Sequence, residues 1–132
     1  MSTIFSVSDG KLIEAQQYLG TIKSYIWDIT HTYLLAEITN ASYSSIASQI
    51  TSPLNLATLS DVQLTSEFQT LRQNNPNVQI TSYTYDPLIG VTSVTDTRGY
   101  TMYYEYDDLN RLKHVKDKDG NILSENLYNY KN

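Results

Sequence analysis

The chain has 132 residues, about one domain by length, and a formal net charge of −5 at neutral pH. Its few Lys and Arg residues are scattered, which argues against nucleic acid as a partner, because phosphate binding needs basic side chains clustered on one face. The absence of Cys excludes a disulfide framework, a zinc-thiolate site and a Cys nucleophile. Twelve Tyr residues against one Trp and two Phe favour half-buried sheet, so we expect mainly β structure.

No apolar run reaches the roughly 18 residues of a membrane-spanning helix, so no such helix is expected. The N-terminal residues contain no basic segment followed by an apolar run, and no secretory signal is predicted. If the protein is exported, it uses another route or the sequence is a fragment of a longer chain.

Four β-prone runs precede residue 40, and they cover 3–8, 11–17, 22–28 and 33–39. Asp9-Gly10 joins the first two runs, and such a dipeptide is the strongest short-range signal for a hairpin. The second of these runs is also compatible with a short helix. A polar segment, 29–32, separates the last two runs, which predicts a second hairpin.

After Asn40 the apolar period changes from that of a strand to that of a helix. Apolar side chains at i, i+3, i+4 and i+7 predict one face of a short helix: Tyr43, Ile46, Ala47 and Ile50. Either Asn40 or Ser42 caps this helix, and Pro53 stops it. A second helix is predicted to begin at Ser60, where Ser60 and Gln63 form a capping box. Its apolar stripe consists of Leu64, Phe68 and Leu71.

Only strands and turns are predicted beyond Val78, and the strands cover 79–85, 91–95, 100–106, 111–116 and 121–130. In the middle strand, one face carries Tyr100, Met102, Tyr104 and Tyr106. Leu112 and Val115 break the alternation of the next strand, which predicts either a bulge or two partly covered faces.

The stretch from Tyr83 to Leu123 contains nearly the same phrase twice. Segments that begin at Tyr83 and Tyr104, offset by 21 residues, agree at seven of twenty positions. The agreeing pairs are Tyr83/Tyr104, Tyr85/Tyr106, Asp86/Asp107, Leu88/Leu109, Val94/Val115, Asp96/Asp117 and Gly99/Gly120. Repetition with a period of about 20 to 50 residues is typical of stacked supersecondary units rather than of a catalytic domain.

Each repeated residue type has an architectural use. Tyr rings on neighbouring hairpins are expected to stack as a cross-strand ladder, worth about 0.2 to 1 kcal/mol per pair. An Asp directly after a strand can accept hydrogen bonds from backbone N–H groups of the turn. Gly99 and Gly120 allow the positive φ that a chain reversal needs.

The repeated phrase has four parts: Tyr104-Glu105-Tyr106-Asp107, Arg111-Leu112, Asp117 to Gly120, and Tyr128-Asn129-Tyr130. This order resembles the YD repeat of the RHS/YD-repeat proteins, and the resemblance extends from Tyr83 to Lys131. The signature residues are Tyr83, Tyr85, Asp86, Asp96, Gly99, Tyr104, Tyr106, Asp107, Arg111, Leu112, Asp117, Gly120, Tyr128 and Tyr130. More loosely, the block from Ser24 to Ala41 is similar to the segment before the terminal YD repeats of Bacteroidetes surface proteins.

The resemblance implies an α+β, mainly β fold. Its expected core is an antiparallel sheet of consecutive YD-repeat hairpins, with two short helices inserted between the N-terminal and the C-terminal strands. We expect a single domain, 1–132, divided into N-terminal hairpins (1–40), a helical insertion (41–77) and YD-repeat hairpins (78–132).

In the family, many such hairpins pair edge to edge into a spiralling sheet that can close as a shell around a toxic cargo. The resemblance therefore implies a non-catalytic structural module that extends or caps such a sheet, without a cofactor. Expected partners are other YD repeats of the same or a longer chain, or second copies paired through sheet edges. The expected location is extracellular or at the cell surface, in a Bacteroidetes-type protein associated with polymorphic toxins.

A binding module is the alternative, in which an exposed Tyr face binds carbohydrate or protein, because sugar rings and proteins both stack on Tyr. Catalysis has weaker support. His31 and His114 are the only histidines, and no nucleophile-elbow motif accompanies them. The acidic side chains of Glu105, Asp107, Asp108 and Glu125 suit solubility at sheet edges better than glycoside hydrolysis. Asp117 to Asn121 fails the register of a calcium loop and fits a β-turn.

Overall fold

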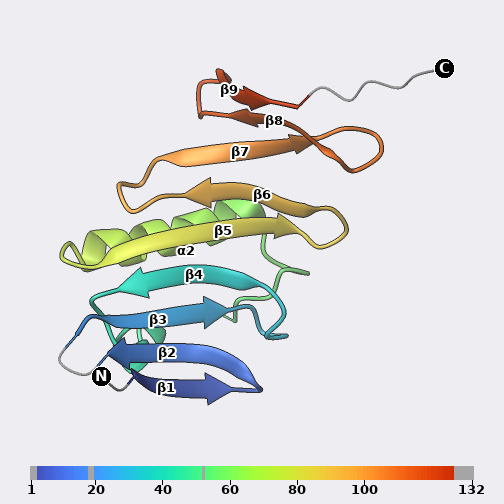
Figure 1. The fold of residues 1–132 in the computed structure, drawn as a ribbon. Helices are drawn as coiled ribbons and strands as arrows, with labels where there is room; N and C mark the ends of the chain where they lie inside the picture. Colours follow the sequence, from blue (N-terminus) through green and yellow to red (C-terminus); the bar gives the residue numbers. More distant parts are fainter. Residues whose placement is uncertain (1–2, 18–19, 52, 127–132) are drawn as a thin grey trace.

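The computed structural model describes residues 3–17, 20–51 and 53–126 (Figure 1). These residues form one nine-stranded antiparallel sheet in which the order of the strands follows the sequence. The strands are β1 (Thr3–Ser8), β2 (Lys11–Gln17), β3 (Ile22–Trp27), β4 (Leu34–Thr39), β5 (Gln79–Asp86), β6 (Gly90–Thr95), β7 (Thr101–Tyr106), β8 (Leu112–Lys116) and β9 (Ile122–Glu125). The helices are α1 (Tyr43–Ala47) and α2 (Asp61–Asn74). The prediction of a mainly β fold with two short helices is confirmed.

Both predicted N-terminal hairpins form, as β1–β2 and β3–β4. At the first turn, Asp9 and Gly10 adopt positive φ angles of 50° and 75°, as the Asp-Gly signal requires. The alternative of a short helix over residues 11–17 is wrong, because these residues pair with strands on both sides. The predicted strand 121–130 is observed as β9, and its last residues lie outside the described part of the chain.

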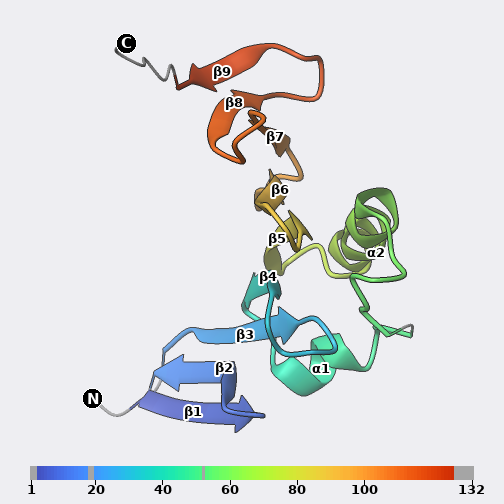
Figure 2. The same cartoon turned by 90° about the vertical axis from the view of Figure 1, so that its right-hand side faces the viewer.

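A β-bulge recurs at the same place in five pairs of consecutive strands. In each case the second strand has one residue without a counterpart, just after the turn. These residues are Ile13, Leu35, Thr92, Lys113 and Leu123. Both alternatives for the strand at 111–116 are observed, because Lys113 forms a bulge and side chains on both faces of β8 are partly buried. Bulges increase the local right-handed twist, and the strands turn through a large angle from β1 to β9 (Figure 2).

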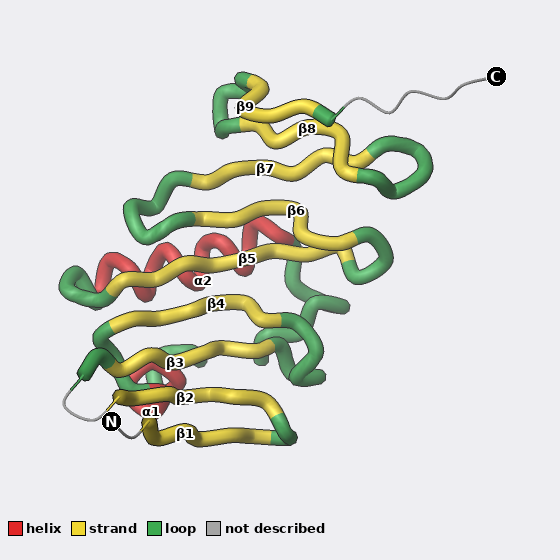
Figure 3. Tube along the Cα trace, in the orientation of Figure 1, coloured by secondary structure: helices red, strands yellow, loops and turns green. Residues whose placement is uncertain are grey.

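The two helices lie in the connection between β4 and β5, which spans 40–78 (Figure 3). They cover the same face of the sheet, with α1 against β3 and α2 against β5 (Figure 2). Ser42, and not Asn40, caps α1, since its Oγ accepts a hydrogen bond from the Ser45 amide. The predicted capping box of α2 forms between Ser60 and Gln63, at 2.8 and 3.2 Å. Among the described residues, neither helix has the length and apolar character needed to cross a membrane.

The hydrophobic core lies between these helices and the central strands. Its fully buried members come from β4, β5 and both helices: Leu35, Ile38, Ile80, Ile46, Leu64 and Phe68. The side chain of Arg72 also ties α2 to the sheet, because one guanidinium nitrogen donates to the Ile80 carbonyl and the Ser82 hydroxyl. Burial lowers the pKa of Arg72. No comparable layer of described residues covers the same face of β7 to β9.

Candidate functional site: repeated turns and tyrosines

Three turns of the C-terminal half share one geometry. In each, an Asp Oδ1 accepts hydrogen bonds from the backbone amides two and four residues later, at 2.9 to 3.0 Å. The amide three residues later donates to the carbonyl of the same Asp. These residues are Asp96, Asp107 and Asp117. Each carboxylate thus satisfies the polar backbone groups that a chain reversal leaves unpaired, as the sequence predicted.

The fourth residue of each turn adopts a positive φ angle. Gly99 and Gly120 do so at 87° and 86°, in agreement with the prediction, and Asn110 takes the same place at 60°. Asn tolerates this conformation better than most residues. Asp86 begins a related turn, in which its Oδ1 accepts a hydrogen bond from the Leu88 amide at 2.9 Å.

The side chain four residues after the Asp reinforces two of these turns. Arg111 donates from Nε to Oδ2 of Asp107 at 2.9 Å, and Asn121 donates from Nδ2 to Oδ2 of Asp117 at 3.0 Å. Hydrogen bonds from the Arg111 backbone and side chain hold the pKa of Asp107 below its usual value. The Asn121 hydrogen bonds lower the pKa of Asp117 in the same way. The Arg of the signature is therefore a turn residue.

An aspartate turn that the sequence analysis did not identify begins at Asp28. Its Oδ1 accepts hydrogen bonds from the Thr32 and Tyr33 amides, both at 2.9 Å, and its Oδ2 accepts one from the Thr30 hydroxyl. His31, three residues after the Asp, has a φ of 56°. Burial opposes ionisation of the Asp28 carboxyl, but the hydrogen bonds outweigh burial and hold its pKa below the ordinary value.

Polar aromatic atoms link consecutive hairpins. The Tyr85 hydroxyl donates to the Leu34 carbonyl and the Tyr106 hydroxyl to the Val91 carbonyl, both at 2.7 Å. Trp27 makes the equivalent bond from Nε1 to the Leu12 carbonyl at 2.8 Å. Each donor is the last or the next-to-last residue of the first strand of one hairpin, and each acceptor is the first or second residue of the second strand of the hairpin before it. We call these three contacts the aromatic staples.

The sequence carried a signal for the staple of β3. Tyr25-Ile26-Trp27-Asp28 has the same form as the phrases that begin at Tyr83 and Tyr104, with Trp in place of the second Tyr. A search for Tyr alone misses it. The chain therefore has three consecutive hairpins that carry a staple. In each, the phrase Tyr, any residue, an aromatic residue and Asp lies where the first strand ends.

The signature tyrosines lie on the face of the sheet opposite the helices. Tyr83, Tyr85, Tyr104 and Tyr106 alternate along β5 and β7 with residues that face α2 or its flank. Burial raises the pKa of Tyr85 to about 12.

The prediction of a ladder of tyrosine rings between the repeated hairpins is wrong, because the signature rings of β5 and β7 do not contact each other. Tyr85 contacts the Tyr33 ring at 5.2 Å and the Tyr83 ring at 6.5 Å between centroids. Within the described residues, no ring contact joins β5 to β7. The reason is that β6 lies between them and places Val94 beside Tyr83.

The remaining candidate site residues lie at a strand end, in contacts between charged side chains, or outside the described residues. Leu112 begins β8 beside the bulge at Lys113, and Tyr128 and Tyr130 lie outside the described residues. His114 lies between Glu105 and Glu125 of the neighbouring strands, at 3.4 and 3.2 Å, and Lys116 contacts Glu105 at 2.8 Å. The other histidine, His31, lies 3.1 Å from Asp9. No group of three or more metal-ligating side chains is assembled within residues 3–17, 20–51 and 53–126.

A search with protein-family models finds no match to the chain, and a search of curated proteins finds none either.

The staples give a matched pair of substitutions on one strand. Tyr106→Phe removes the hydroxyl that bonds to the Val91 carbonyl, and it should lower the free energy of unfolding by about 0.5–1.5 kcal/mol. Tyr104→Phe is the control, because the Tyr104 hydroxyl has no hydrogen bond to another described residue. Urea unfolding of both variants measures the difference. Equal losses in the two variants would show that the staple contributes nothing.

Asp28 predicts a loss of stability in acid. Its folded pKa lies below the unfolded value of 3.8, so its stabilising effect is complete above pH 3.8 and is lost as the pH falls through the folded pKa. In urea unfolding between pH 6 and 2.5, Asp28→Asn should reduce the acid-induced loss of unfolding free energy. Asp108→Asn, the same substitution at an exposed position, is the matched control. Parallel profiles for wild type and Asp28→Asn would contradict this assignment.

Proposed function

We propose that the chain is a non-catalytic structural module, a YD-repeat segment of an RHS-like surface or exported protein that extends or caps a β-sheet wall. The observation that carries the proposal is the repeated hairpin. The same bulge and the same staple, together with a turn that an Asp side chain stabilises, recur from one hairpin to the next. Every recurring contact therefore either closes a hairpin or joins it to its neighbour.

Assembly would occur at the two sheet edges. Within the described residues, β1 pairs only with β2, and β9 pairs only with β8. The outer strands also carry exposed apolar side chains, with Phe5 62% exposed on β1 and Ile122 52% exposed on β9. An open strand presents unpaired main-chain groups that recruit another strand, either from further repeats or from a second copy.

The described side chains support this role better than a catalytic one. The carboxylates of Asp96, Asp107 and Asp117 accept hydrogen bonds within their own turns, and Glu105 is held by Lys116 and His114. The hydrogen bond from Lys116 lowers the pKa of Glu105, which suits an ion pair rather than a general acid. A location outside the cell or on its surface rests on the resemblance alone.

Edge pairing predicts self-association. Small-angle scattering at rising protein concentration should show an increase in mass. The double variant Phe5→Lys, Ile122→Lys should remain a monomer, because edge lysines oppose strand addition. Val62→Lys is the control, since Val62 is 78% exposed on α2, away from both edges. A wild type that stays monomeric throughout, or a control as monomeric as the edge variant, would contradict the proposal.

A second candidate function is the binding of carbohydrate or protein at the Tyr face. Three tyrosine hydroxyls on this face favour it. Tyr25, Tyr83 and Tyr104 lie on the helix-free face of β3, β5 and β7, half-buried, and their hydroxyls have no hydrogen bond to another described residue. Alternate strands of a sheet lie roughly 10 Å apart, so these rings form a regular platform.

A glycan array tests this second candidate. If the platform binds, the triple variant of Tyr25, Tyr83 and Tyr104 to Ala should lose a specific signal and still fold by circular dichroism. Tyr106→Phe is the control, because its hydroxyl is already engaged with the Val91 carbonyl. No specific signal from the wild type on glycan or peptide arrays would leave the structural module as the function.

A further inference from the structure

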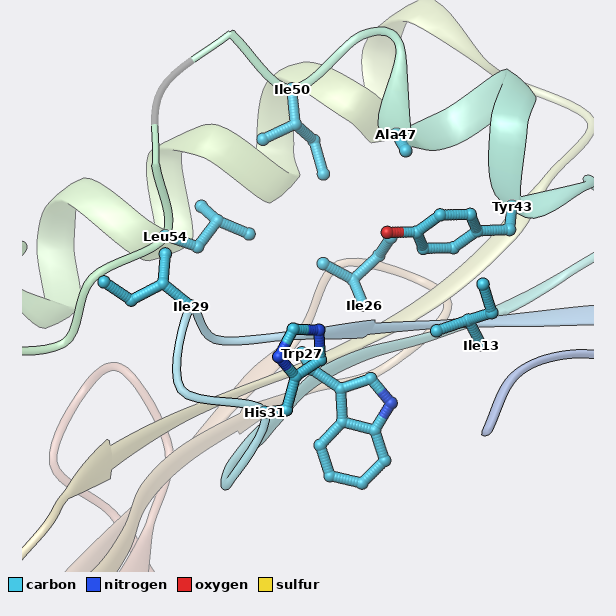
Figure 4. Close-up of a pocket in the computed structure, with 9 residues that line it drawn as sticks. All are labelled: Ile13, Ile26, Trp27, Ile29, His31, Tyr43, Ala47, Ile50 and Leu54. Atoms are coloured by element: carbon cyan, nitrogen blue, oxygen red, sulfur yellow. The ribbon is translucent and has the colours of Figure 1, made fainter. Parts of the chain in front are cut away.

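A small cavity lies between α1 and the sheet, on the helix-covered face (Figure 4). Its volume is about 160 Å³. Ile13 and Ile26 line it from β2 and β3, and Ala47, Ile50 and Leu54 line it from α1 and the segment that follows. Trp27 contributes only one margin, because its indole extends to the other side of β3 (Figure 4).

The sequence explains why this space stays open. The bulge of the first hairpin is at Ile13, whereas the equivalent bulge residue of the second hairpin, Leu35, is completely buried in the core. Helix α1 presents the single methyl group of Ala47 toward the cavity, and the Tyr43 ring lies between Ala47 and Ile13 (Figure 4). A larger residue at position 47 would fill the cavity.

Two polar side chains face this space, whose exposed lining is about as polar as it is apolar. The Tyr43 side chain extends from the start of α1 and directs its hydroxyl between Ile26 and Leu54 (Figure 4). That hydroxyl has no hydrogen bond to another described residue, while the Tyr43 amide is fixed by Glu14 Oε1 at 2.7 Å. At the other margin, Nδ1 of His31 lies 3.1 Å from Asp9, which leaves Nε2 as a second hydrogen-bonding group.

We propose that this cavity is a binding site for a single six-membered ring that carries one hydroxyl group, such as a phenol. An apolar cavity of roughly 150 Å³ is large enough for benzene, whereas sites for drug-sized ligands measure roughly 300 Å³ or more. The side chains of Ile13, Ile26 and Ile50 match the ring, and the Tyr43 hydroxyl matches the polar substituent. The ring comes either from a free small molecule or from a Tyr side chain of a partner segment. This site is independent of the sheet edges and of the proposed structural function.

Titration with phenol, followed by NMR of the Ile methyl groups, tests the site. Saturable shifts are expected for Ile13, Ile26 and Ile50. Ala47→Leu should abolish them, whereas Ala57→Leu, the same change at an exposed position, should not. Tyr43→Phe should weaken phenol binding about three- to tenfold, as the loss of one hydrogen bond implies, and should leave toluene binding unchanged. N-acetyltyrosinamide, titrated in parallel, separates the two sources of the ring.

Each outcome decides the proposal or its ligand. Binding of phenol alone identifies a free small molecule, and binding of both probes identifies a site that also admits a tyrosyl segment. The absence of saturable shifts at those methyl groups overturns the proposal, as do unchanged shifts in a folded Ala47→Leu variant. If Ala47→Leu fails to fold, Tyr43→Phe decides, because equal loss of phenol and toluene binding, or no loss of either, overturns the role of the hydroxyl.

Discussion

The carboxylate that closes each turn is the interaction on which the sheet depends. A chain reversal leaves amides that must find acceptors, and in this protein an Asp side chain accepts two of them at the end of a strand. The next strand then begins at a fixed position, and one bulged residue follows before its pairing with the first strand continues. The bulge at Lys113 and the staple of Tyr106 lie directly beside the Asp107 turn, so the contacts within a hairpin and those between hairpins meet at this point.

The helices cover the central strands of the sheet and leave its ends uncovered. They bury β3, β4 and β5 on one side, and the fully buried side chains are concentrated there. Beyond β6, the same face is exposed and carries charged side chains such as the row Glu105, His114 and Glu125. Stability should therefore decrease from the middle of the sheet toward its ends, because hydrophobic burial scales with the apolar area that is covered.

Local signals in the sequence predict most of this fold. The Asp-Gly turn, the capping box at Ser60 and the repeated Asp turns act within a few residues, so their geometry follows from residue types alone. The unit at Trp27 was missed because the insertion separates it from Tyr85 by 58 residues, whereas Tyr85 and Tyr106 are 21 apart. The tyrosine contacts and the cavity beneath α1 depend on which strands and helices become neighbours, and no local pattern encodes that choice.

The insertion between β4 and β5 shows that a connection can be long without changing how the strands pair. The two strands that it joins pair without a register shift, although two other links on that margin of the sheet, 96–100 and 117–121, are single turns. Links on this margin can therefore be long while the strands that they join still pair in register. For protein engineering, this makes them natural sites for grafting an epitope or an enzyme onto the protein.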